Sequence, residues 1–184
     1  MSPTLEDLQE AFAGLLGPVP AAAPVVLEPA PGVGEAPIAA LAAAPVPAPA
    51  PSPIQLVDAK VHGYHLDVTV APDQVVMVAD LIDAKGFAID AVTGVDWMVA
   101  GQMEVVYDFY HFHSPLHVVV RTRVPREKPE LPTISGVFPG ANWHERETHE
   151  FFGIKFLGHP KLIPLLLPED AEYHPLRKDF TGAA

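Results

Sequence analysis

Residues 139–160 read Pro139-Gly-Ala-Asn-Trp-His-Glu-Arg-Glu-Thr-His-Glu-Phe-Phe-Gly-Ile-Lys-Phe-Leu-Gly-His-Pro160, a run that concentrates charge, aromatic rings and turn-forming residues. The segment from Asn142 to Phe152 contains neither glycine nor proline, and we predict a helix there that ends at Gly153. The residues that follow, rich in proline and charge, predict a short extended piece and then an irregular C-terminal tail.

Upstream of this run the sequence predicts a small α+β domain. Four segments alternate apolar and polar residues as half-buried strands do: residues 64–70, 87–92, 103–112 and 116–124. We expect a helix over 72–85, a turn at Thr93-Gly94 and a loop over 125–132. This order predicts a two-layer α+β fold in which helices pack on a small, mainly antiparallel sheet, with an extended C-terminal tail.

The N-terminal third reads differently. Residues 4–16 have the apolar stripe of a short helix, with Thr4 and Asp7 placed for a capping box. Residues 18–53 hold eleven prolines and twelve alanines, which predicts a disordered linker. We therefore divide the chain into a short helix (1–17), a linker (18–53) and a domain (54–184). The helix is expected to be a frayed terminus, with a tethered docking peptide as the alternative.

Composition excludes several classes of protein. The chain of 184 residues has no cysteine, so it has no disulfide, thiolate zinc site or cysteine-ligated iron–sulfur cluster. Its formal net charge is −12 with only 11 Lys and Arg residues, which argues against binding nucleic acid. No apolar run is long enough to cross a bilayer, and we expect no direct membrane span.

The motifs resemble those of one known family. The series Glu-Arg-Glu147, Phe-Gly-Ile154, Gly-His-Pro160, Leu-Pro-Glu169 and His174-Pro-Leu-Arg-Lys-Asp179 is similar to the signature of the thirty-kilodalton subunit of respiratory complex I, the C-type subunit of NADH-quinone oxidoreductase. This resemblance implies a non-catalytic peripheral-arm subunit of a proton-translocating NADH:quinone oxidoreductase. It also implies a place on the cytoplasmic face of the inner membrane.

The same resemblance implies partners. It places the chain against the large quinone-site (D-type) subunit and the small iron–sulfur (B-type) subunit. It also implies that FMN, iron–sulfur clusters and quinone belong to those partners and that this chain holds no cofactor. The Thr-His-Glu-Phe-Phe152 and Pro164-Leu-Leu-Leu-Pro168 variants look closer to relatives in membrane-bound hydrogenases or ferredoxin-linked complexes. An equivalent subunit of a complex with a nickel–iron centre is therefore the alternative.

The predicted site is a surface for other subunits. We expect catalytic, cofactor and metal residues to be absent, and we place the subunit interface at Trp143, Glu145, Arg146, Glu147, His159, Pro160, His174, Arg177, Lys178 and Asp179. The alternative is a solvated helix face with local ion pairs such as Arg146–Glu150. A metal-dependent hydrolase built on His144, Glu145 and His149 is a distant alternative, because zinc-binding histidines on one helix are four residues apart rather than five.

Overall fold

A computed structural model describes residues 3–17 and 53–182. The predicted linker at 18–53 lies, apart from Pro53, outside these residues. The described chain forms a five-stranded sheet in the order β1-β2-β5-β4-β3. The strands are β1 (Ile54–Leu56), β2 (Leu66–Val70), β3 (Phe87–Trp97), β4 (Gln102–His111) and β5 (His117–Pro125). Within this five-stranded sheet β2 and β5 pair in parallel and the other three pairs are antiparallel, so the predicted mainly antiparallel sheet is confirmed.

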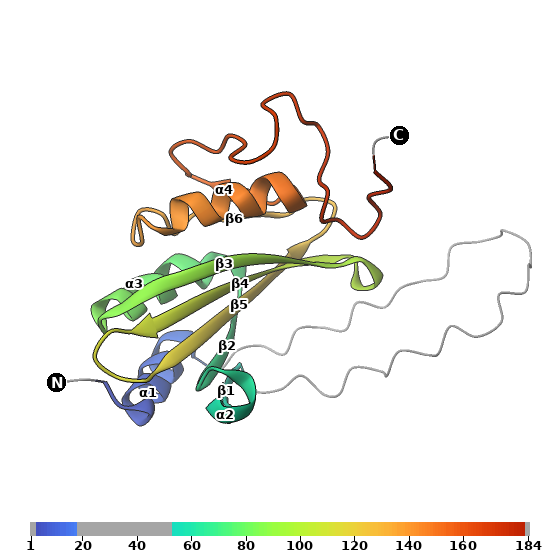
Figure 1. The fold of residues 1–184 in the computed structure, drawn as a ribbon. Coiled ribbons are helices and arrows are strands. Elements are labelled where there is room, and N and C mark those ends of the chain that lie inside the picture. Colours follow the sequence, from blue (N-terminus) through green and yellow to red (C-terminus); the bar gives the residue numbers. More distant parts are fainter. Residues whose placement is uncertain (1–2, 18–52, 183–184) are drawn as a thin grey trace, which may run out of the picture.

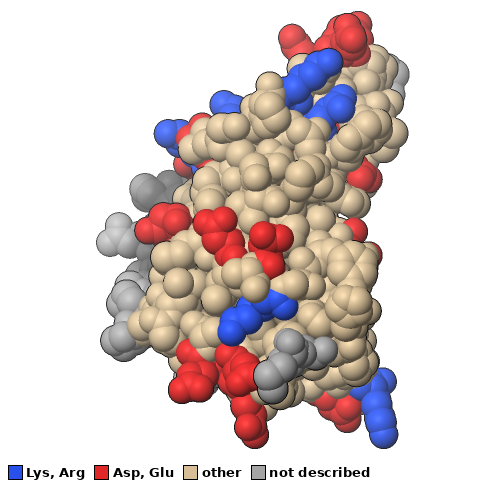
Figure 2. Space-filling view, turned by 90° about the vertical axis from the view of Figure 1, so that its left-hand side faces the viewer, with Lys and Arg blue, Asp and Glu red and all other residues tan. Residues whose placement is uncertain are grey.

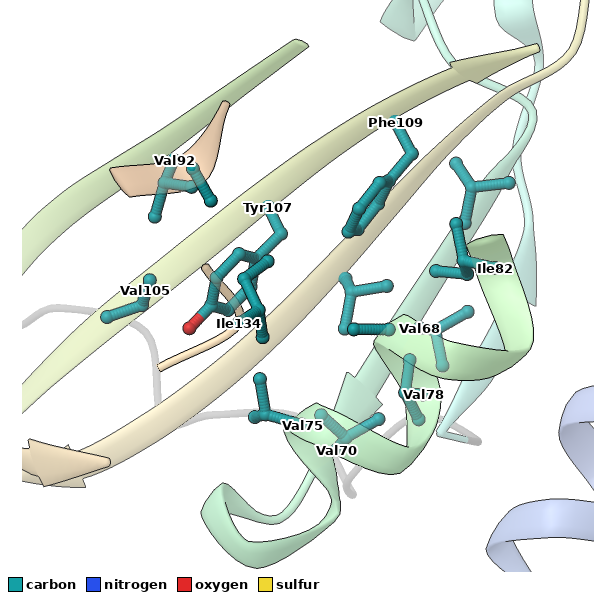
Figure 3. Packing of buried hydrophobic residues seen from close by; sticks show 14 of the residues in the cluster. Val68, Val70, Val75, Val78, Ile82, Val92, Val105, Tyr107, Phe109 and Ile134 are labelled. Carbon is teal, nitrogen blue, oxygen red and sulfur yellow. The ribbon is translucent and has the colours of Figure 1, made fainter. Parts of the chain in front are cut away.

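The sheet and the three longer helices share one apolar core (Figure 1), to which the short helix after β1 adds no buried residue. The helices are α1 (Leu5–Leu16), α2 (Ala59–His62), α3 (Val75–Ala84) and α4 (Ala141–Phe152), with short 3-10 turns η1 (Pro72–Gln74) and η2 (Met98–Ala100). Figure 3 shows Val75, Val78 and Ile82 of α3 pointing at Tyr107 and Phe109 of β4. Alternate residues of β2, β4 and β5 thus meet the helices, and the predicted two-layer α+β fold is confirmed.

Ion pairs cover the opposite face of the sheet. Asp67 of β2 pairs with Arg121 of β5 at 2.9 Å, and Glu104 of β4 pairs with Arg123 of β5 at 2.9 Å. The 3.9 Å contact between Arg121 and Glu104 joins the two pairs into one ladder. The long arginine side chains lie over this face of the sheet, where Val119 is buried.

α1 is part of the core. The predicted capping box is present, because the Thr4 hydroxyl accepts from Asp7 N and the Asp7 carboxylate accepts from Thr4 N. Leu8 and Phe12 are fully buried, and α1 contacts α3 and β1. The expectation of a frayed terminus is therefore wrong. Burial of two large apolar side chains stabilises the helix by several kcal/mol at about 25 cal/mol per Å².

Two local predictions are wrong. β3 continues through Thr93 and Gly94, where we expected a turn. The glycine is needed inside the strand because a Cβ at Gly94 would lie 2.5 Å from the ring of Phe152 on α4. The predicted loop at 125–132 contains β6 (Glu130–Pro132), which pairs in parallel with β7 (Lys155–Leu157). That pairing depends on a segment 25 residues away, so no local pattern indicates it.

Candidate docking surface

The chain after β7 runs back over α4 without regular secondary structure (Figure 1). We call residues 158–182 the strap. The predicted extended tail is present, but it lies folded against its own domain. Polar contacts with α4 and β3 hold it there, and they involve most of the residues that the sequence singled out.

The His174-Pro-Leu-Arg motif caps the C-terminus of α4. The last four carbonyls of a helix have no partner within it. Here each accepts one hydrogen bond at 2.7–3.1 Å: His149 from Gly153 N, Glu150 from His174 Nδ1, Phe151 from Leu176 N and Phe152 from Arg177 Nε. The positive charge of Arg177 also suits the negative end of the helix dipole. The motif therefore has an intramolecular role in this chain.

Gly153 makes this cap possible. Its φ is +77°, the left-handed conformation that favours glycine after a helix. A Cβ at this position would lie 2.5 Å from Nη2 of Arg177 and 2.6 Å from Nε2 of His174. Both strap side chains cross directly over the glycine, so its lack of a side chain serves the backbone turn and the capping contacts together.

Glu150 holds a second part of the strap. Its side chain is almost fully buried and accepts hydrogen bonds from three successive backbone N–H groups. Those of Leu165, Leu166 and Leu167 donate to the carboxylate at 2.8–3.1 Å. A buried carboxylate needs such donors to compensate for the loss of water. The side chain therefore serves contacts within its own chain.

Arg146 holds the neighbouring backbone from the other side. Its Nε donates to the carbonyl of Ile163 at 3.0 Å, and its Nη2 donates to that of Pro164 at 2.8 Å. The guanidinium also lies 5.9 Å from the ring centroid of Trp143. The i,i+4 ion pair expected between Arg146 and Glu150 is therefore wrong, since each side chain binds the strap instead.

A buried ion pair fixes the end of the strap to β3. Asp96 is bound by Arg126 through two hydrogen bonds of 2.8 and 3.0 Å, and it accepts from Lys178 N at 2.8 Å. Arg126 also contacts Asp179 at 2.7 Å. Hydrogen bonding to Arg126 lowers the pKa of Asp96 and of Asp179 below their ordinary values. Both carboxylates are therefore charged at neutral pH, as their hydrogen bonds to the Arg126 guanidinium require.

Glu145 is fully buried within the chain, away from any surface that a partner could reach. Its carboxylate accepts a short hydrogen bond from the Thr133 hydroxyl and one of 2.8 Å from Ile134 N. His159 Nε2 lies 3.9 Å away but donates to the carbonyl of Asn142. Burial raises the pKa of Glu145 to about 7 and lowers the pKa of His159, so this contact is not an ion pair.

Glu145 makes the stability of the fold depend on pH. Because its pKa is raised from 4.5 to about 7, the folded chain binds this proton more tightly than the unfolded chain does. Its contribution is complete below about pH 4.5 and is lost as pH rises through about 7. Relative to E145Q, the native chain should lose about 3 kcal/mol of unfolding free energy between about pH 5 and about pH 8. Urea titrations across this range, with E147Q on the exposed face as control, measure it, and a pH-independent difference would contradict the assignment.

The other five predicted interface residues lie at the surface of the chain. Trp143, Glu147, Pro160, Lys178 and Asp179 are exposed, so they remain candidates for contact with another protein. The sequence missed the apolar side chains that the strap exposes: Ile163, Leu166, Tyr173, Leu176 and Phe180. The one signal in the sequence is the run of three leucines at 165–167, a pattern that fits either a core segment or an anchor for a partner. Leu166 is 65% exposed, which favours the second interpretation at that position.

The hydrolase alternative finds no support in the geometry. Glu145 turns toward Thr133, and His149 Nδ1 donates to the carbonyl of Ile154 at 2.8 Å. Across residues 3–17 and 53–182 no group of three or more His, Asp or Glu side chains could hold a metal ion. Within the same ranges no helix is both long and apolar enough to traverse a bilayer.

The fold and the surface together define a class of protein: an α+β scaffold domain with a clamped, outward-facing apolar strap. The model of one family, the respiratory-chain NADH dehydrogenase 30 kDa subunit, matches residues 68–184. The chain belongs to this family, and the resemblance drawn from the Glu-Arg-Glu147 to Asp179 motifs is confirmed.

Curated relatives come from several respiratory complexes. The C-type subunit of F(420)H(2) dehydrogenase from Methanosarcina mazei is 43% identical over 94 residues, 50% of this chain and 59% of that protein. The C-type subunit of NADH-quinone oxidoreductase from Roseiflexus sp. (strain RS-1) is 40% identical over 119 residues, 62% of this chain and 68% of that protein. The chain therefore spans less than two thirds of the first relative and just over two thirds of the second.

A solved structure shares the fold. The membrane-bound sulfane sulfur reductase, described as an archaeal respiratory membrane complex, contains a similar chain with a TM-score of 0.58 and 32% sequence identity. The similarity covers 62% of the present chain and 71% of that one. The same domain thus occurs in complexes whose names specify different electron donors and acceptors.

Proposed function

We propose that this chain is a non-catalytic peripheral-arm subunit of a complex I-like, proton-translocating NADH:quinone oxidoreductase. The observation that carries the proposal is the strap, whose backbone is clamped by Glu150, Arg146 and Arg177 while its apolar side chains face outward. Exposed apolar residues held in a fixed backbone are the form that a protein–protein hot spot takes. Membership of the 30 kDa subunit family supplies the kind of assembly.

The partners follow from the same proposal. The strap lies against the large quinone-site (D-type) subunit, and the small iron–sulfur (B-type) subunit is the second neighbour. FMN, iron–sulfur clusters and quinone are held by partner subunits, and the chain sits at the cytoplasmic face of the inner membrane. Figure 2 shows Lys and Arg interspersed with Asp and Glu on the face in view, and acidic side chains gathered at its top, where Figure 1 places the strap.

A second candidate differs in the electron donor. The relative in F(420)H(2) dehydrogenase and the similar chain in a sulfane sulfur reductase show the domain in complexes that are not named for NADH or quinone. The second candidate is therefore an equivalent subunit of a ferredoxin-linked or nickel–iron hydrogenase complex. The proteins that co-purify with the tagged chain from its native membranes separate the two. Flavin-containing, NADH-oxidising subunits support the first candidate, and a nickel–iron subunit supports the second.

Leu166→Asp tests the docking role directly. The Leu166 side chain is exposed, and this residue is held only through its backbone N–H, which donates to Glu150. The negative charge of an aspartate side chain at this position should therefore leave folding intact and disrupt only a contact with a partner. We expect roughly tenfold less of the tagged chain in the assembled complex, the effect of losing one hot-spot residue. Quantitative mass spectrometry of purified membranes measures this, and thermal unfolding of the isolated chain checks its stability.

Val61→Asp is the matched control, because Val61 is 74% exposed and belongs to α2, which lies far from the strap in the sequence and in the fold (Figure 1). It should assemble like the native chain. Equal assembly of both variants would argue against docking through the strap. Alanine at Arg146 or Arg177 is a poorer test, since both side chains hold the strap in place.

A further inference from the structure

Glu145 is a buried acid that faces the beginning of the strap, residues 158–161, which we call the first turn. The two groups that donate to its carboxylate, the Thr133 hydroxyl and Ile134 N, are both neutral. Among the described residues, His159 is the one basic side chain within ion-pair distance of the carboxylate. A buried carboxylate is costly without a positive charge beside it, so the charge of His159 decides the state of the site.

The hydrogen bonds of His159 fix its ring as neutral. Its Nδ1 accepts from Lys161 N at 3.1 Å, so that nitrogen carries no hydrogen. Its Nε2 carries the one hydrogen of the neutral ring and donates to the carbonyl of Asn142 at 3.2 Å. A charged ring would carry a hydrogen on both nitrogens and would turn one of them against the N–H of Lys161. His159 therefore offers Glu145 no counter-charge while the first turn keeps this geometry.

Groups on the neighbouring elements bring no positive charge either. Tyr107 of β4 is buried, its hydroxyl has no hydrogen-bond partner within the described ranges, and burial together with the charge of Glu145 raises its pKa. On α4 itself, Arg146 donates to two carbonyls of the strap. His149 donates to the carbonyl of Ile154, and burial lowers its pKa. The charged form of Glu145 thus has no cationic partner among the described residues.

The neutral acid fits the same site. Its O–H can donate to Thr133 Oγ1, and the Thr133 hydroxyl then donates to Ser135 Oγ at 2.8 Å. Burial correspondingly raises the pKa of Glu145 to about 7. The folded chain therefore holds a proton here up to neutral pH, and the carboxylate needs water once that proton is lost.

Water reaches Glu145 at least cost from the side of the strap. On the other side lies Ile134, which is 1% exposed and belongs to the apolar core. The buried side chain of His159 lies 3.9 Å from the carboxylate, and the strap is next bound to α4 at Ile163, through Arg146. The first turn can therefore move away without disturbing the core or the rest of the strap.

We propose that the contact between Glu145 and His159 is a pH-sensitive latch on the strap, closed while the carboxyl carries a proton and opened to water when the proton is lost. The closed state binds the proton more tightly than the open state, so closure is favoured at low pH and weakens as pH rises to about 7. The latch concerns the free chain and is independent of the proposed function. It adds a local movement to the pH dependence of overall stability.

Hydrogen exchange of the full-length native chain tests the latch at a single amide. The Lys161 N–H, which donates to His159, should lose roughly tenfold in protection between about pH 6 and about pH 8, after correction for the intrinsic exchange rate. The loss should level off above about pH 7, once Glu145 is ionised in the closed state. The amides of Leu165–Leu167, which are bound by Glu150, are the internal control and should stay protected.

Two variants separate the latch from other effects of pH. Glu145→Gln keeps the shape of the side chain and removes its titration, so the protection of Lys161 should no longer depend on pH. Glu147→Gln, on the exposed face of α4, should behave like the native chain. Protection of Lys161 that stays constant with pH in the native chain, or that falls equally in Glu145→Gln, would overturn the proposal. An equal fall at Leu165–Leu167 would also overturn it, because the whole strap would then be opening.

Discussion

Gly153→Ala should lower the free energy of unfolding by about 3 kcal/mol, because it combines two costs. A side chain in the left-handed conformation at φ +77° costs roughly 1 kcal/mol. The new Cβ would also displace the ends of Arg177 and His174, which now lie within 2.6 Å of its position. Both side chains can swing away, but the carbonyls of Glu150 and Phe152 then lose their partners.

Gly63→Ala separates the two costs. Gly63 ends α2 in the same left-handed conformation, with φ +83°, and a Cβ there would have no heavy atom within 4 Å. It should cost only about 1 kcal/mol, the conformational part alone. Chemical unfolding of both variants measures the difference, and limited proteolysis should cut the strap faster only in Gly153→Ala. Equal costs at both glycines would mean that the capping contacts contribute nothing.

The end of α4 shows what local sequence could predict. A glycine after an uninterrupted helical run is a backbone signal, and the helix does end at Gly153. The strands at 103–112 and 116–124 were likewise visible, because their alternation reflects one buried and one solvated face. These features depend on residues within a few positions of one another, where pattern and structure correspond directly.

The contacts of the site could not be predicted, because they join residues that are far apart in the sequence. His174 and Arg177 were chosen as interface residues, yet they cap a helix that ends more than 20 residues earlier. The resemblance of the Glu-Arg-Glu147 motif predicts Glu145 at the interface, but α4 turns this side chain toward Thr133 and Ile134. The sequence located the residues that matter. Only the fold shows that several of them serve this chain, leaving the strap's apolar side chains for a partner.

Glu150→Ala should be comparably damaging, and its effect should concentrate on the strap. The side chain satisfies the N–H groups of Leu165, Leu166 and Leu167, and the backbone carbonyl of the same residue accepts from His174. Hydrogen bonds to a charged acceptor contribute about 1.5–3 kcal/mol, and three that share one carboxylate do not add fully. We expect a loss of about 3 kcal/mol, with hydrogen exchange at these three amides accelerating far more than in the sheet.

Glu147→Ala is the control on the same helix, since Glu147 is exposed, and it should change stability by no more than about 0.5 kcal/mol. Glu150→Ala should also lower assembly, because releasing Leu166 removes the pre-organised backbone that the proposed partner contact requires. Slow exchange at Leu165–Leu167 in this variant would show that the strap is held by other contacts. Fast exchange at these three amides together with normal assembly would show instead that the partner orders the strap. The hydrogen bonds to Glu150 would then stabilise only the free chain.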